Sequence, residues 1–102
     1  MGLDISLVKK EHLMDMNITH NLTPMWKKAG IYDALYNSEC YEARDVLPVL
    51  IDGLNHMIAN QEEYEKLNSP NGWGVYEHAV PWLSELIVEF KNNPRGIIEV
   101  SR

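Results

Sequence analysis

The stretch LDISL, Leu3 to Leu7, alternates apolar and polar residues with a period of two, which is the pattern of a half-buried β-strand. The stretch IEVS, Ile98 to Ser101, shows the same alternation near the other end of the chain. We expect the two strands to pair with each other. Because an isolated strand pair is marginally stable in water, either helices cover one face or a second subunit extends the sheet. The polar residues are expected on the other face: Asp4, Ser6, Glu99 and Ser101.

Between these strands the apolar residues follow the spacing of helices. Three helices are expected: Thr23-Pro24 to Tyr36, Ala43 to Ile58, and Tyr76 to Phe90. Gly30 weakens the first helix by about 1 kcal/mol relative to alanine, so a role in close packing is expected for it. Pro48 and Pro81 fit a first turn better than a helix interior, which leaves the starts of the other two helices open. The expected fold is one α+β domain over residues 1–102, with three main helices packed on a short two-stranded sheet.

Composition and charge narrow the class of protein. The 102 residues are 45% hydrophobic and 24% charged, as in an ordinary globular domain. No apolar run approaches the roughly 20 residues of a membrane-spanning helix, and the start of the chain does not resemble a secretory signal. A single cysteine, Cys40, agrees with a reducing compartment. The net charge of −6 argues against binding to nucleic acid. We expect a protein of the cytosol that binds neither membrane nor nucleic acid.

The segment NITHNLTP, Asn17 to Pro24, fits the helical pattern poorly. In one interpretation Thr23 caps the following helix, and the polar residues before it satisfy backbone groups of the turn. In the other, His20 and Asn21 lie at a helix N-terminus with two lysines one turn further on, which favours an anion such as phosphate or carboxylate. The sequence leaves both interpretations open.

The segment NSPNGWGVYEH, Asn68 to His78, places a tryptophan between two glycines. As structure, it is a turn from which Trp73 closes the core between helices. As a binding site, Trp73 and Tyr76 offer flat faces for a base or sugar, and Asn71 offers an amide that both donates and accepts hydrogen bonds. The two misfitting segments form one pocket if the first and third helices start on the same side of the domain.

Motifs for catalysis are weak in this sequence. The four histidines show no HxxxH pair, so no metal site is expected. A Cys40–His20 nucleophile pair lacks a surrounding signature, and no phosphate loop, GxSxG or CxxC motif is present. We therefore expect no catalytic residues and no cofactor, and an enzyme is the less favoured interpretation.

Four stretches carry a resemblance over nearly the whole chain: LDISL, NITHNLTPMWKKAGIYDALY, NSPNGWGVYEH and IIEVSR. Together they resemble a family of small proteins found in bacteriophage genomes and prophages. The resemblance implies a phage context and the cytosol of a host cell rather than a mechanism. Pro81 departs from the helix that the resemblance implies, so the positions of Tyr76 and His78 do not follow from it. By analogy with small accessory phage proteins, we expect a host-directed, counter-defence role.

Three functions follow from these patterns. The first is sequestration, without catalysis, of a small anionic or nucleotide-like ligand by five residues: His20, Asn21, Asn71, Trp73 and Tyr76. The second is inhibition of a host protein, in which the acidic middle of the chain, Glu39 to Glu65, meets a basic surface. The third is a small hydrolase or transferase. A homo-oligomer is expected in each case, because a short terminal sheet has free edges and binding sites often lie between subunits.

Overall fold

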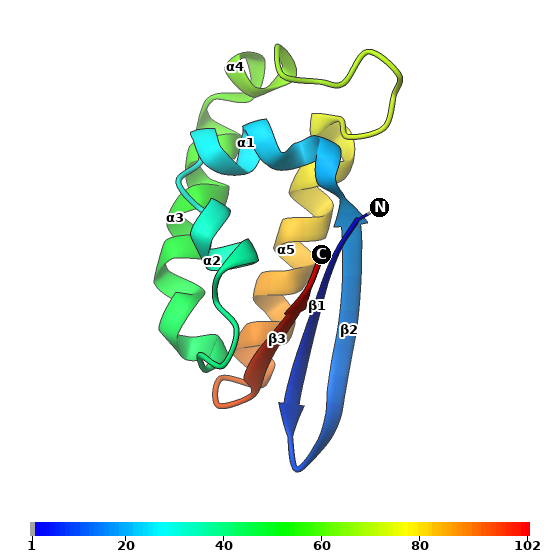
Figure 1. Cartoon of the computed structure of the whole chain (residues 1–102). Coiled ribbons are helices and arrows are strands. Elements are labelled where there is room, and N and C mark those ends of the chain that lie inside the picture. Colours follow the sequence, from blue (N-terminus) through cyan, green and yellow to red (C-terminus); the bar gives the residue numbers. More distant parts are fainter. Residues whose placement is uncertain (1) are drawn as a thin grey trace.

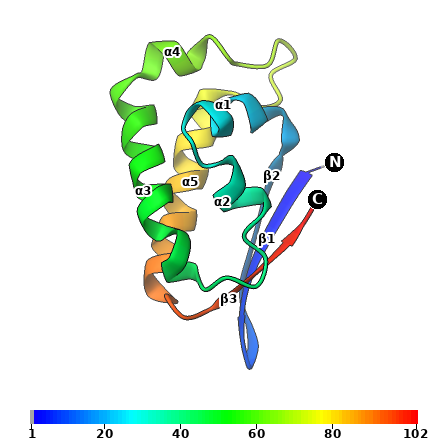
Figure 2. The same cartoon turned by 60° about the vertical axis from the view of Figure 1, so that its left-hand side comes forward.

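The computed structural model describes residues 2–102 and shows an α+β fold in two layers (Figure 1). The helices lie on one face of an antiparallel sheet, and the opposite face of the sheet is open (Figure 2). None of the helices in this part of the chain is both long and apolar enough to cross a membrane. The elements are, in chain order, β1 (Gly2–Lys9), β2 (Glu11–Thr19), the 3-10 helix η1 (His20–Leu22), α1 (Thr23–Lys28), α2 (Tyr32–Tyr36), α3 (Ala43–Ala59), α4 (Gln61–Glu65), α5 (Tyr76–Asn92) and β3 (Ile97–Ser101).

The sheet has three strands in the order β2-β1-β3, so the prediction of a two-stranded sheet is wrong by one strand. The predicted pairing of the terminal strands is confirmed, because β1 and β3 pair antiparallel with Ile5 opposite Val100 and Leu7 opposite Ile98. Residues that face each other across an antiparallel pair share a face of the sheet. The predicted polar face is confirmed by the register, which places Ser6 opposite Glu99 and Asp4 opposite Ser101.

The strand that was not predicted is β2, which forms a hairpin with β1 and includes the first three residues, Asn17 to Thr19, of the segment interpreted as a turn before a helix. Its inner residues Met14, Met16 and Ile18 lie opposite the inner residues of β1. The alternation does not extend along the whole strand, because the register shifts at Leu7/Val8 and leaves Leu13 as an extra residue. Because of this extra residue, the sequence of β2 does not show the regular alternation by which a strand is predicted.

The first predicted helix is divided into α1 and α2. Gly30 ends α1 in a left-handed conformation, with a φ of +76°, and the Ile31 N–H then donates to the Trp26 carbonyl at 2.9 Å. A Cβ at Gly30 would meet nothing within 4 Å, so the expected close packing at this glycine is wrong. Thr23 does not cap α1, since it is the first residue of that helix and Leu22 is the residue before it; the Thr23 hydroxyl donates to the His20 carbonyl at 2.6 Å.

The two long helices, α3 and α5, run antiparallel and pack against each other, with α5 lying between α3 and the sheet (Figures 1 and 2). Pro48 and Pro81 lie inside them, and neither proline starts a helix. Both side chains are exposed, so the carbonyl that each proline leaves unpaired one turn earlier lies on a hydrated side of the helix. Near the start of α3, the Asp45 carboxylate accepts from the Glu42 N–H at 2.9 Å.

The core lies between the sheet and the helices. The inner residues of β1, Leu3, Ile5 and Leu7, are almost completely buried. Trp26 from α1 and Trp82 from α5 are also buried, with ring centroids 5.8 Å apart. Two of the three tryptophans of the chain therefore belong to the core.

Close packing does involve a glycine, at Gly53 of α3. A Cβ at this position would clash with Ile31 Cγ2 and would lie 3.3 Å from the Ala29 carbonyl oxygen. We expect Gly53→Ala to lower the free energy of unfolding by about 1–3 kcal/mol, because overpacking against buried Ile31 outweighs the gain of about 1 kcal/mol in helix propensity. Urea unfolding measures the change. Asn55→Ala, at an exposed position of the same helix, is the control for propensity; an equal or higher stability of Gly53→Ala would contradict the prediction.

Candidate functional site

The loop between α4 and α5 is held by its own hydrogen bonds. The Asn71 side-chain oxygen accepts from the Ser69 hydroxyl at 2.7 Å and from the Trp73 N–H at 2.9 Å. Gly72 and Gly74 have φ values of +79° and +100°, which residues with a side chain rarely adopt. This tight turn directs the Trp73 side chain into solvent, and the residue is 70% exposed. The interpretation of Trp73 as a core plug is therefore wrong.

The same loop packs directly against η1. A Cβ at Gly74 would lie 2.6 Å from Asn21 Cβ and 2.9 Å from the Asn21 carbonyl carbon. Only a glycine permits this approach of the loop to the turn that follows β2. The two segments that fit the helical pattern poorly, one before α1 and one before α5, are therefore in contact.

Two shallow hollows, of about 540 and 440 Å³, lie where the two segments meet. Both are lined by Trp73 and by the end of β2, Asn17 to Thr19. The larger hollow is also lined by Gly2, His20 and Asn21. The smaller one is also lined by Leu22, Gly72, Gly74 and His78. We call these two together the Trp73 hollows.

The described residues that line the Trp73 hollows include no aspartate or glutamate, although the chain has 15 acidic residues and a net charge of −6. Their polar groups are the amides of Asn17 and Asn21, the hydroxyl of Thr19 and the imidazoles of His20 and His78. Asparagine, threonine and neutral histidine each offer a hydrogen-bond donor. The hollows combine these donors with an exposed indole.

The structure brings together three of the five residues predicted to bind a ligand: His20, Asn21 and Trp73. Asn71 does not line the Trp73 hollows, because its side-chain oxygen lies inside the turn. Tyr76 is buried in the core rather than exposed for stacking, and its hydroxyl donates to the Met57 carbonyl at 2.9 Å. Burial raises the pKa of the Tyr76 phenol. Asn71 closes the turn in the middle of the loop, Tyr76 anchors the end of the loop in the core, and neither is part of the proposed binding surface.

The contribution of Asn17, Ile18 and His78 to the hollows was not predicted from the sequence. The first two lie at the end of β2, the strand that was missed. The alternation from Met14 to Ile18 is the signal that could have placed them on a strand leading into the His20 turn. His78 follows Trp73 by five positions and lies at the start of α5, where no sequence pattern distinguishes it from a solvated residue.

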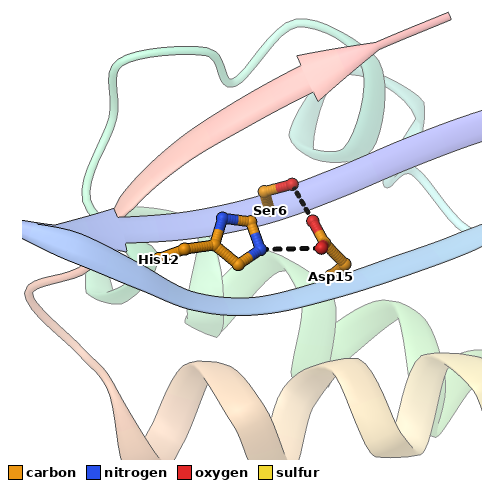
Figure 3. Close-up of polar contacts among 3 residues, drawn as sticks. All are labelled: Ser6, His12 and Asp15. Carbon is orange, nitrogen blue, oxygen red and sulfur yellow. Dashed lines mark hydrogen bonds and ion pairs between the residues drawn. The ribbon is translucent and has the colours of Figure 1, made fainter.

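A second polar cluster lies on the open face of the sheet (Figure 3). The Ser6 hydroxyl donates to Asp15 Oδ1 at 2.5 Å, and His12 Nε2 lies 2.7 Å from Asp15 Oδ2. The hydrogen bond from Ser6, and then that from His12, lowers the pKa of the Asp15 carboxyl. The three side chains join β1 to the outer strand β2.

These residue types are those of a Ser-His-Asp triad, but their arrangement differs. In a triad the imidazole accepts the serine proton, and the carboxylate holds the far side of the imidazole. Here Ser6 and His12 both bind Asp15 (Figure 3), so the serine donates to the carboxylate rather than to a base. Within residues 2–102, moreover, no group of three or more His, Cys, Asp or Glu is placed to hold a metal ion. The cluster is a structural link between strands.

The Asp15 cluster predicts a pH dependence. Because its pKa is lowered from 3.8 in the fold, Asp15 stabilises the fold above this pH, and the contribution is lost as the pH falls through the lowered pKa. We expect Ser6→Ala to move the pKa of Asp15 back toward 3.8, as measured by NMR titration of its carboxyl carbon. Ser101→Ala, on the same face but opposite Asp4, is the control. An unchanged pKa in Ser6→Ala would contradict the assigned cause.

The contact between Gly74 and Asn21 predicts unequal effects of two loop substitutions. Gly72→Ala introduces only a left-handed alanine, at a cost of about 1–2 kcal/mol, because a Cβ there would meet nothing within 4 Å. Gly74→Ala adds a clash with backbone atoms, so we expect it to lose about 1–3 kcal/mol more. Urea unfolding of both variants measures the difference. Equal losses would contradict the close packing of loop and turn.

Comparison with known proteins provides no separate assignment of function. Protein-family models, curated proteins and solved structures were compared with this chain, and none matches it. The chemistry of the Trp73 hollows is therefore the basis of the function proposed below.

Proposed function

We propose that this protein binds, without catalysis, a small ligand that carries a planar ring and an anionic group, as a nucleotide does. The main support is the position of Trp73, 70% exposed and at the border of both hollows. A base that stacks on an exposed aromatic ring gains about 1–3 kcal/mol. The loop already holds the Trp73 backbone in place, through the hydrogen bond from its N–H to Asn71, so little backbone freedom is lost on binding.

The polar residues of the hollows support an anionic ligand. The Thr19 hydroxyl oxygen accepts from the Asn21 N–H at 3.2 Å, which leaves its own hydrogen for a ligand. The side-chain amides of Asn17 and Asn21 add further donors. An anionic oxygen gains from several donors at once, and among the described lining residues it meets no carboxylate that would repel it.

We place this binding in a phage-infected cell, where sequestration of a nucleotide-like signal would counter a host defence. The support is the resemblance of the chain to small phage proteins together with the position of the ring-binding surface. A shallow hollow of about 540 Å³ suits capture of a small molecule, and its described lining contains no activated nucleophile.

A second proposal, inhibition of a host protein, has support on α4. Glu62, Glu63 and Glu65 are exposed and line a further hollow beside Ile58, whose side chain is 55% exposed. An apolar side chain among carboxylates fits a partner with a basic surface around an apolar patch. This surface lacks an aromatic anchor, so the proposal ranks below ligand binding.

We also propose weak self-association through the free edge of β2. This strand of nine residues is paired on one side only, by β1. Its charged residues Glu11 and Asp15, and the irregularity opposite Leu7 and Val8, reduce the tendency of such an edge to pair. Association is therefore expected only at high protein concentration.

Native mass spectrometry with an equimolar mixture of adenosine, AMP, ADP and cyclic AMP tests ligand binding. We expect a stoichiometric adduct with the wild-type protein. Trp73→Ala should lower the affinity by about 1–3 kcal/mol, or about 5- to 150-fold, because the stacking surface is lost.

The matched control is Tyr41→Ala, which removes an aromatic side chain that is 56% exposed and lies outside the hollows. Tyr41→Ala should bind as the wild type does. An adduct that persists unchanged in Trp73→Ala would contradict the site, and the absence of any adduct would contradict the ligand class.

A further inference from the structure

His20, a lining residue of the larger hollow, forms a hydrogen bond with a buried tyrosine, Tyr36. Its Nδ1 atom lies 2.9 Å from the hydroxyl of Tyr36, and the two ring centroids are 5.6 Å apart. The Tyr36 side chain is buried, and its ring is stacked on Tyr32 at a centroid distance of 4.5 Å. The orientation of the imidazole is therefore set by a rigid neighbour.

The hydrogen atoms available in this cluster limit the ways in which His20, Tyr36 and Thr23 can bond to one another. The Thr23 hydroxyl donates its single hydrogen to the His20 carbonyl at 2.6 Å, so it has no hydrogen left to donate to Tyr36. The Tyr36 hydroxyl has two neighbours that can accept its hydrogen, His20 Nδ1 at 2.9 Å and Thr23 Oγ1 at 3.4 Å. The shorter contact is the stronger hydrogen bond.

The phenol of Tyr36 remains protonated over the physiological range. Burial raises its pKa above the ordinary value of 10.0, and the nearby charge of Arg102 opposes this only in part. A phenol that donates to Nδ1 requires this nitrogen to be unprotonated. The neutral imidazole then carries its hydrogen on Nε2.

We propose that Tyr36 is a positioning residue that holds His20 as the Nε2–H tautomer, and that this N–H donates to an anionic oxygen of the ligand, such as that of a phosphate ester. This inference rests on the proposed function for the ligand but not for the tautomer. The Nε2–H of His20 joins the amide of Asn21 and the hydroxyl of Thr19 in the larger hollow, while Trp73 binds the ring of the ligand. The site thereby selects phosphorylated over unphosphorylated compounds.

NMR of the free protein tests the tautomer. In a long-range proton–nitrogen spectrum at a pH where His20 is neutral, we expect the single pattern of the Nε2–H tautomer in the wild type. Tyr36→Phe removes only the hydroxyl, and a detectable Nδ1–H population should then appear. Tyr32→Phe keeps the stacked pair and the bond to His20, so its spectrum should match the wild type. An Nδ1–H pattern in the wild type, or no change in Tyr36→Phe, would overturn the assignment.

Titration with AMP and adenosine tests the role of the donor. We expect Tyr36→Phe and His20→Ala to weaken AMP binding threefold or more, while adenosine binding changes less than twofold. Equal losses for both compounds would show a structural role for Tyr36 and would overturn the proposed selection. A wild-type protein that shows the Nε2–H pattern but binds neither compound would overturn the proposed function and the donor role, but not the tautomer.

Discussion

Burial of the inner face of β1 is the constraint on which the rest of the structure depends. Leu3, Ile5 and Leu7 are almost completely buried, and β1 is paired on both sides. A slip of one residue in either pairing would turn an apolar row onto the open face, so the registers of β2 and β3 are both fixed by this strand. The end of β2 is fixed with them, and the chain enters η1 at a defined point. The position of His20 at the surface is thus a consequence of packing in the centre of the sheet.

The candidate site is formed by two turns whose hydrogen bonds are largely internal. Asn71 closes one turn, and Gly74 allows that turn to lie against Asn21 of the other. Trp26 and Trp82 already fill the core, so the third tryptophan is not needed there. The internal hydrogen bonds order the backbone of this loop, so the proposed binding by Trp73 would not require the backbone to be ordered again.

Sequence periodicity predicted the elements that bury a regular apolar face and missed those whose pattern is interrupted. LDISL, IEVS and the residues of α3 and α5 have clear periods, and their elements are present. The extra residue Leu13 breaks the alternation of β2. Gly30 divides the first helix through its left-handed conformation, which the sequence pattern does not reveal. For the site, the misfitting segments contain His20, Asn21 and Trp73, and the structure shows that these residues are neighbours, which the sequence had left open. The amide of Asn71 and the ring of Tyr76 have the right chemistry for binding, but the turn and the core use them instead.

Charge places a limit on how this protein can recognise an anion. With a net charge of −6, its long-range field repels a phosphorylated ligand, and at physiological ionic strength that field is screened beyond about 8 Å. Affinity must therefore come from contacts made at hydrogen-bond distance and from stacking, not from steering by a basic surface. The Trp73 hollows meet this requirement, because their described lining offers neutral donors while exposed carboxylates such as Glu62, Glu63 and Glu65 lie on α4. The proposed site would depend on the direction of each donor, so a buried tyrosine that orients His20 would contribute more than an added positive charge.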